Sequence, residues 1–167
     1  MSSRESEAFP KAKLVRDLRS GESGLDRIDV AILRELWADA RIPRAELARR
    51  VGLSAPSVAD RVRRLEDRGV ITGYGARIDP ARLGCGLTVL IRARPLPGEM
   101  ARMIEAIRAT PQIVTCDRVS GDDCFVARAH VRDVAEMEAV IDRIVPFGAT
   151  NSSIVQSTPV VERLIDL

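Results

Sequence analysis

Apolar residues recur at helical spacing through the first half of the chain, and turn residues divide this pattern into three segments. Asp26 is placed to cap the first segment, Pro43 suits the start of the second, and Ser54 can cap the third. Gly52 allows a positive φ between the last two segments, and Gly69 follows the third. The pattern predicts three helices, over about Leu25 to Ala40, Arg44 to Val51 and Ala55 to Arg68.

The third of these helices has a single apolar stripe. Val58, Val62 and Leu65 fall in one narrow sector of the helix, so we expect them to face the first two helices. Residues 70–78 are expected to form a short two-stranded wing or a linking strand, which Asp79-Pro80 ends.

Beyond Gly84 the pattern alternates between strand and helix periods. We expect strands at Gly86 to Arg94, Val114 to Ser120, Cys124 to Val131 and Ser152 to Ser157, and helices at Gly98 to Ala109 and Asp133 to Val145. The order βαββαβ predicts a ferredoxin-like arrangement, in which an antiparallel sheet carries both helices on one face. The end of the chain, Pro159 to Leu167, fits either a strand or a helix.

A sheet covered by helices on one side leaves its other face open. The strands carry many apolar residues, so a partner chain is the natural cover, and we infer a homodimer formed through this domain. The apolar strand residues behind this inference are Leu87, Val89, Ile91, Val119, Phe125 and Ala127.

The fold class predicted from these patterns is α+β, with two domains. A flexible arm (residues 1–24) precedes a winged helix-turn-helix domain (25–79), and a linker (80–85) joins it to the ferredoxin-like domain (86–167). A length of 167 residues and an apolar fraction of 46% are sufficient for two small cores.

Composition narrows the class of protein further. Neither a membrane-spanning apolar run nor an apolar signal segment is present, which favours a soluble cytoplasmic protein that does not contact membranes. Cys85, Cys116 and Cys124 lack C-x-x-C spacing and are expected to be buried reduced thiols. With His130 as the single histidine, we expect no metal site. Residues 1–85 carry a net charge of +4 and residues 86–167 one of −2, a weak asymmetry.

The surface of the third helix carries the clearest functional pattern. Its side chains are small near the N-terminus of the helix and cationic further along, as a helix that enters the major groove requires. Arg61 lies at the edge of the apolar stripe, where its stem can pack while its head reaches backbone phosphates. The residues expected to contact DNA are Ser54, Pro56, Ser57, Asp60, Arg61, Arg63 and Arg64. The alternative is a solvated face whose arginines are balanced by Glu66 and Asp67.

Several of these residues resemble the signature of a known family. The helix-turn-helix part of the resemblance runs through Leu25-Asp26-Arg27-Ile28-Asp29, Glu46-Leu47-Ala48, Val51-Gly52-Leu53-Ser54, Arg61, Leu65-Glu66, Gly69-Val70-Ile71 and Tyr74. Val119-Ser120-Gly121-Asp122-Asp123 and Thr150-Asn151-Ser152-Ser153-Ile154-Val155 extend it into the second domain. Over about residues 25–165 the chain resembles the feast/famine regulators, the Lrp/AsnC family.

That resemblance implies a DNA-binding domain, a ligand domain, dimers that assemble into tetramers or octamers, and control by an amino acid. It also implies an effector site between dimers, and the matching positions are Gly121, Asp122, Asp123, Thr150 and Ser152. Acidic side chains can bind an α-ammonium, and backbone N–H groups around a glycine turn can receive an α-carboxylate. Where the family often has a further aspartate, this chain has Cys124.

The sequence thus predicts a sequence-specific regulator of transcription that binds double-stranded DNA, is modulated by a small molecule and is not an enzyme. Three alternatives stay open. Residues 121–123 can be a plain hairpin turn. The chain can be an enzyme similar to the haem-precursor decarboxylases, although His130 is its single histidine. It can also be an assembly module that no longer binds DNA.

Overall fold

The computed structural model describes residues 24–165, so the predicted arm, residues 1–24, lies outside the described residues apart from Gly24. The chain divides into two compact units. The first runs to Gly75 and also includes the described residues 164–165, and the second spans Ala76–Arg163. Each unit has its own apolar core, and each is described by itself.

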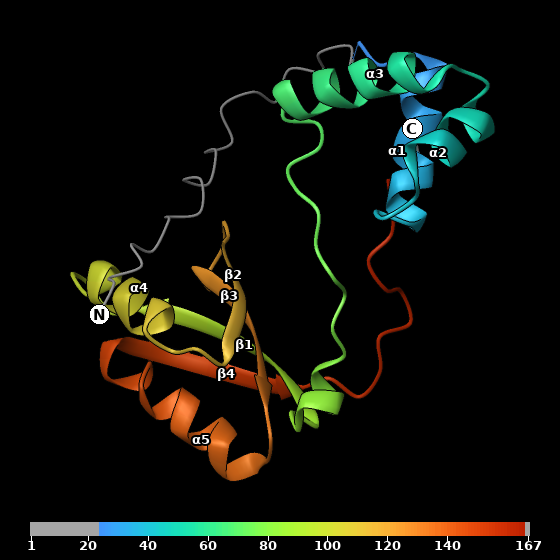
Figure 1. The fold of residues 1–167 in the computed structure, drawn as a ribbon. Helices are drawn as coiled ribbons and strands as arrows, with labels where there is room; N and C mark the ends of the chain where they lie inside the picture. The colour runs from blue at the N-terminus through green and yellow to red at the C-terminus, as the bar shows by residue number, and fades with distance from the viewer. Residues whose placement is uncertain (1–23, 166–167) are drawn as a thin grey trace, which may run out of the picture. The chain divides into compact units, whose positions relative to one another are not determined.

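The first unit is a bundle of three helices (Figure 1), α1 (Arg27–Ala38), α2 (Arg44–Val51) and α3 (Ala55–Asp67). The predicted stripe of α3 is confirmed, because Val58, Val62 and Leu65 are buried in one cluster with Ile32 of α1 and Leu47 of α2. Burying each aliphatic side chain contributes about 1.5 to 3 kcal/mol, which makes this cluster the main stabilising element of the bundle.

Local capping chemistry explains the ends of these helices. The Asp26 side chain accepts hydrogen bonds from the backbone of Ile28 and Asp29, and the Asp29 side chain accepts one in return from the Asp26 N–H. Ser54 caps α3 by accepting from Ser57 N at 3.3 Å. Gly52 ends α2 with a φ of 70°, as its position in the sequence predicts.

The strand predicted within residues 70–78 is wrong, because these residues form no strand in the described structure. A strand needs a neighbour to satisfy its backbone groups. Instead, the N–H groups of Val70 and Ile71 both reach back to the Leu65 carbonyl at the end of α3. The segment therefore begins as the close of the helix.

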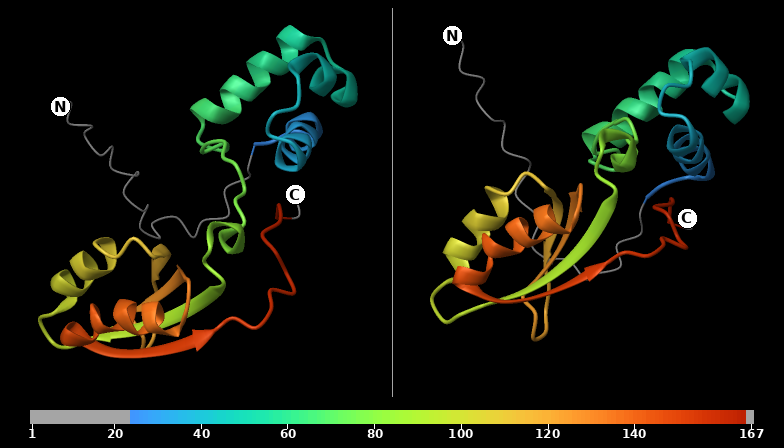
Figure 2. Two further views of the ribbon diagram at one scale, coloured as in Figure 1. Left: turned by 60° about the horizontal axis from the view of Figure 1, so that its bottom comes forward. Right: turned by 90° about the horizontal axis from the view of Figure 1, so that it is seen from below.

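The second unit contains the predicted order βαββαβ. Its elements are η1 (Pro80–Leu83), β1 (Leu87–Pro95), α4 (Met100–Arg108), β2 (Ile113–Arg118), β3 (Phe125–Val131), α5 (Val134–Asp142), η2 (Val145–Phe147) and β4 (Gly148–Ile154). The four strands are antiparallel, in the order β2-β3-β1-β4, with both helices on one face (Figure 2). The ferredoxin-like prediction is thus confirmed. No helix or strand is present in residues 155–165, where the sequence left both open.

The largest error in element boundaries concerns the last strand, which begins at Gly148 rather than at Ser152. Gly148 pairs with Pro95 of β1, and a Cβ at this position would lie 2.1 Å from the Arg94 carbonyl oxygen and 2.8 Å from Met103 Cε. In the sequence, this glycine suggests a break between elements. In the structure, it allows β4 to begin, because the neighbouring backbone comes too close for any side chain.

The uncovered face of the sheet also differs from expectation. Val89, Ile91, Phe125 and Ala127 are buried in the core that the helices cover, so they do not form the open face. Leu87 packs against that same core, and Val119 lies beyond the end of β2. Because strand side chains alternate, the other face carries mixed residues. These are Thr88, Leu90, Arg92 and Arg94 on β1 and Val126, Arg128 and His130 on β3.

The apolar argument for a partner chain on this face is therefore wrong, and a homodimer stays a prediction. Among residues 24–165, no helix combines the length and the apolar character needed to cross a membrane.

The environment of Gly148 generates a stability prediction. Gly148→Ala should lower the free energy of unfolding by about 1 to 3 kcal/mol, because the added methyl group must displace backbone rather than a flexible side chain. Gly86→Ala is the matched control, since its Cβ would meet its nearest atom, the Arg132 carbonyl oxygen, at an ordinary 3.9 Å. Chemical denaturation of both variants measures the difference, and equal midpoints would refute the close approach.

Candidate functional site

The solvent-exposed side of α3 is organised as its periodicity predicts. With Val58, Val62 and Leu65 buried, the opposite side of the helix is turned to solvent. Five of the predicted DNA contacts are exposed along this side, and they are Pro56, Ser57, Asp60, Arg63 and Arg64. The small side chains stand in the first turn and the guanidinium groups in the third.

Ser54 precedes this surface as the N-cap residue. Its hydroxyl lies 2.8 Å from the Ser57 hydroxyl, so the two serines form one polar pair at the start of the helix. Since the first backbone N–H groups of a helix carry partial positive charge, this end presents donors to an anion.

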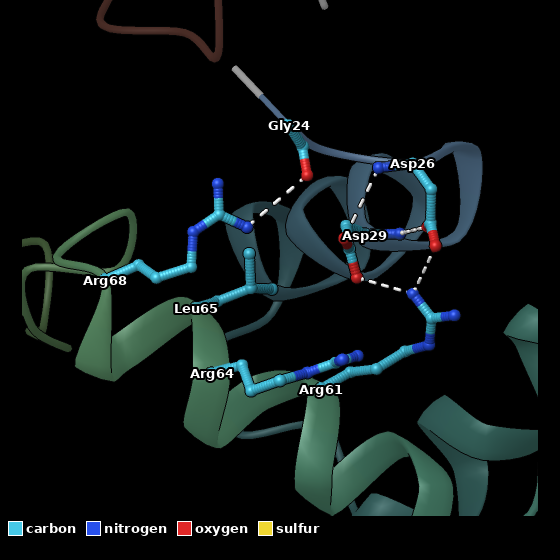
Figure 3. A pocket seen from close by; sticks show the side chains of 7 residues that line it. All are labelled: Gly24, Asp26, Asp29, Arg61, Arg64, Leu65 and Arg68. Atoms are coloured by element: carbon cyan, nitrogen blue, oxygen red, sulfur yellow. Dashed lines mark hydrogen bonds and ion pairs between the residues drawn. The ribbon is translucent and has the colours of Figure 1, made fainter. Parts of the chain in front are cut away.

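Arg61 is placed differently from the other predicted contacts. Its Nη1 donates to Asp26 Oδ2 at 2.6 Å and to Asp29 Oδ1 at 2.8 Å, both in the region where α1 begins (Figure 3). Its side chain is 22% exposed. These hydrogen bonds raise the pKa of Arg61, while the Asp29 N–H and the Arg61 guanidinium lower the pKa of Asp26. One nitrogen of the guanidinium that was expected to reach phosphate, Nη1, is thus engaged within the protein.

A shallow hollow of about 190 Å³ lies beside this ion-pair cluster. Arg64 and Arg68 of the helix end line it together with Gly24, whose carbonyl oxygen accepts from Arg68 Nη1 at 3.4 Å (Figure 3). The remaining lining residues are Asp26, Asp29, Arg61 and Leu65. The hollow therefore lies between the chain before α1 and the last turn of α3.

A second ion-pair network fixes α2. Glu46 accepts from Arg49 and Arg50, and Arg50 Nη1 also donates to Glu35 of α1 at 2.7 Å. These arginines lower the pKa of Glu46 to about 2. The sequence analysis missed this network, although the three-residue and four-residue spacings within α2 favour such pairs.

The end of α3 is tied to the segment that follows it. The Tyr74 hydroxyl donates to Glu66 Oε1 at 2.8 Å. Burial, and then this bond, raise the pKa of Tyr74 to about 12. Although Tyr74 belongs to the resemblance quoted above, nothing in its spacing identifies Glu66 as its partner.

The predicted effector turn joins β2 to β3. Gly121 has a φ of 118°, which favours glycine, and Asp122 and Asp123 follow it with side chains 94% and 40% exposed. Arg94 of β1 reaches this turn, donating from Nε to the Asp122 carbonyl oxygen at 2.7 Å. Its Nη2 lies 3.7 Å from the Asp122 carboxylate and 3.9 Å from that of Asp123. The turn thus carries both signs of charge, and the sequence analysis missed Arg94.

The other two predicted effector residues lie on β4. Thr150 pairs with Ala93, which in turn pairs with Phe125 near the turn, and Ser152 pairs with Ile91. Two strand spacings of about 4.8 Å therefore separate Thr150 from the strand that leaves the turn. Within one chain these residues do not join the turn in a single site.

The remaining candidate groups belong to the second unit. His130 Nδ1 lies 3.0 Å from the Thr88 hydroxyl on the uncovered sheet face, and burial lowers the pKa of His130. The cysteines are free as expected but not buried, because Cys116 is exposed and Cys85 and Cys124 are half-buried. Within residues 24–165, no group of three or more histidine, cysteine and acidic residues is arranged to hold a metal ion.

Comparison with known proteins covers both units. Residues 25–72 match the family model for winged helix-turn-helix DNA-binding, and residues 88–165 match the Lrp/AsnC ligand binding domain. The chain is 32% identical to the HTH-type transcriptional regulator LrpC of Bacillus subtilis over 80% of its own length and 92% of that protein. The chain belongs to the Lrp/AsnC family.

Solved structures of Lrp/AsnC proteins support this assignment. That of B. subtilis LrpC superimposes with a TM-score of 0.79 at 30% identity and covers 83% of this chain and 99% of its own. A feast or famine regulatory protein from Mycobacterium tuberculosis, complexed with L-methionine, has a TM-score of 0.77 at 36% identity, with 84% and 97% covered. The predicted family and its two-domain fold are confirmed.

As a member of the Lrp/AsnC family, this chain is a DNA-binding transcriptional regulator with a ligand-binding domain. The match to the winged class confirms the kind of domain, even though residues 70–78 form no strand here. The relatives described above are named as regulators. An enzyme similar to the haem-precursor decarboxylases would require side chains that converge on a tetrapyrrole.

The Tyr74–Glu66 bond in this Lrp/AsnC chain predicts an unusual titration. Because the folded pKa of Tyr74 is raised from 10.0 to about 12, its stabilising contribution is complete below pH 10 and is lost as the pH rises through 12. Tyr74 is the single tyrosine, so tyrosinate absorbance reports it alone. Glu66→Gln should shift the midpoint downward. A wild-type midpoint at 10 with the helical circular dichroism intact would exclude the bond.

Proposed function

We propose that α3 lies in the major groove of double-stranded DNA and reads sequence with its exposed side. The observation that carries this proposal is the opposition of two faces on one helix. Val58, Val62 and Leu65 are buried, which leaves the small first turn and the later arginines to meet DNA together. The small residues allow close approach, and guanidinium groups suit guanine edges or phosphates.

Each exposed residue has a chemically distinct part in this proposal. Ser54 and Ser57, at the helix N-terminus, offer hydroxyl and backbone donors to a phosphate. Asp60 can accept from a cytosine amino group, and Arg63 and Arg64 supply the cationic contacts. Arg61, also predicted from the sequence as a contact, differs from these residues because its Nη1 atom donates to Asp26 and Asp29.

DNA binding is tested by titrating the protein against its own upstream region and against bulk DNA over a range of salt concentrations. Affinity should fall steeply with salt, by about 0.9 in the logarithmic slope for each phosphate neutralised. Loss of all binding at low salt would reject the proposal.

Arg64→Ala should lower DNA affinity by about 1 to 3 kcal/mol, and a loss confined to one base position would identify a base contact. A uniform loss on all sequences would instead assign Arg64 to phosphate. Arg108→Ala is the matched control, because Arg108 is an exposed helical arginine of the second unit, paired only locally with Glu105 at 3.1 Å. An unchanged affinity for Arg64→Ala would remove it from the interface.

The second part of the proposal concerns the ligand-binding domain. We infer that an amino acid binds at the turn of Gly121, Asp122 and Asp123. The two carboxylates can pair with its α-ammonium, and Arg94, 3.7 and 3.9 Å from them, adds a cation for the α-carboxylate. The complex of the M. tuberculosis relative with L-methionine supports an amino acid as the class of ligand.

Thr150 and Ser152 enter this site only if a neighbouring chain supplies them, since two strands separate β4 from β2 within one chain. We therefore propose a homodimer that assembles further, to tetramers or octamers, with the effector between dimers. Mass measurement with and without each of the twenty amino acids tests this arrangement. An unchanging monomer would contradict it.

Asp123→Ala should weaken amino-acid binding without weakening DNA binding in the absence of ligand, because it removes one carboxylate from the turn and leaves every residue of α3 unchanged. Calorimetric titration with the amino acid found by a thermal-shift screen measures the change. Asp142→Ala, an exposed acidic residue at the end of α5, controls for the loss of one negative charge. Identical titrations for wild type and Asp123→Ala would exclude this turn.

A further inference from the structure

Three arginines stand close together on α3, but they are used differently. Arg63 and Arg64 are exposed, whereas the Arg61 side chain is only 22% exposed. Its Nη1 atom is shared by two carboxylates, at 2.6 Å from Asp26 and 2.8 Å from Asp29. Figure 3 shows the side chain extending from α3 toward the start of α1 rather than away from the bundle.

The two carboxylates are themselves fixed. Asp26 accepts from the backbone N–H groups of Ile28 and Asp29, and Asp29 accepts from the Asp26 N–H at 3.3 Å. Asp29 is 8% exposed, so this carboxylate is buried in the bundle. The capping box of α1 therefore serves as a rigid receptor for one guanidinium from α3, across 35 and 32 residues of sequence.

The carboxylates around Arg61 weaken it as a phosphate contact. Asp26 and Asp29 share its Nη1 atom, so these three side chains together are net negative, although Arg64 and Arg68 line the hollow beside them. A phosphate approaching Arg61 would meet Asp26, which is 53% exposed. The start of α1 carries a partial positive charge, which offsets part of the repulsion between the two carboxylates. The cap itself already uses the backbone N–H groups that carry this charge.

Aliphatic packing alone leaves the position of α3 underdetermined. The contacts of Val58, Val62 and Leu65 are non-directional, so a small rotation or slide of the helix keeps most of their burial. A hydrogen-bonded ion pair has a preferred geometry and can specify register, which is the best-attested role of partly buried polar groups. The Arg61 cluster adds such a constraint midway along the reading helix.

We propose that Arg61 is a positioning residue, which locks α3 in register on the capping box of α1, and that it does not contact DNA. The proposal rests on DNA binding by α3 for its functional readout. It predicts that the carboxylates of Asp26 and Asp29, although they repel DNA, increase affinity for it by orienting Arg61 and its helix.

The decisive variant is Asp26→Ser combined with Asp29→Asn in the full chain. Serine remains a good N-cap, and asparagine keeps an acceptor for the Asp26 backbone N–H, so α1 retains its capping bonds while both charges are removed. Simple electrostatics predicts tighter DNA binding after the loss of two negative charges. Positioning predicts weaker binding, by about tenfold.

The companion variant is Arg61→Ala, compared with Arg64→Ala over a salt series. A positioning residue should lower affinity while leaving the salt slope unchanged, whereas loss of a phosphate contact reduces the slope by about 0.9. The proposal is overturned if Arg61→Ala reduces the slope in this way, or if the Asp26→Ser/Asp29→Asn variant binds DNA as tightly as wild type.

Thermal unfolding of wild type, Arg61→Ala, Asp26→Ser/Asp29→Asn and the variant that combines all three substitutions forms a double-mutant cycle, and its readout does not depend on DNA. The two changes in Tm should be non-additive, because either one breaks the same lock. Additive shifts would reject the lock. Should the wild-type chain bind no DNA at any salt concentration, the proposed function fails, and the cycle still decides whether Arg61 and the capping box act together.

Discussion

The burial of one aliphatic stripe of α3 is the constraint on which the DNA-binding unit depends. A helix of this length that buries Val58, Val62 and Leu65 has to expose the residues about half a turn away. The apolar stripe therefore selects the side of the helix that we propose to face DNA. The same side chains hold α1 and α2 in place through Ile32 and Leu47, so packing and recognition come from a single periodicity.

The strands of the second unit follow the same rule, because their side chains alternate between the two faces of the sheet. Burying Val89 and Ile91 beneath the helices sends Leu90 and Arg92 to the opposite face of β1. Gly148 shows how closely the strands and helices are fitted, because the Arg94 carbonyl occupies the space of its missing side chain. Arg94 thus belongs to two features, since its backbone confines β4 while its guanidinium reaches the turn after Gly121.

Features set by neighbouring residues were predictable from the sequence. The caps at Asp26 and Ser54 and the turn at Gly52 depend on atoms within a few residues, and the three helices of the first unit end close to their predicted limits. The exposed side of α3 followed from the helical period. The order βαββαβ followed from the alternation of the two periods.

Features that depend on tertiary contacts were not predictable. Nothing local identifies Asp26 as the partner of a guanidinium 35 residues away, so the ion pair of Arg61 was not predicted. The choice between the two faces of the sheet was likewise wrong, because period two gives the alternation but not which set the helices cover. The start of β4 was missed since only the surrounding backbone explains Gly148.

The last turn of α3 is bonded to the chain on both sides of the three-helix bundle. Arg68 bonds to Gly24, just before the first helix, and Glu66 bonds to Tyr74, just before the end of this unit. Both points where the chain enters and leaves the bundle are therefore anchored to side chains two positions apart.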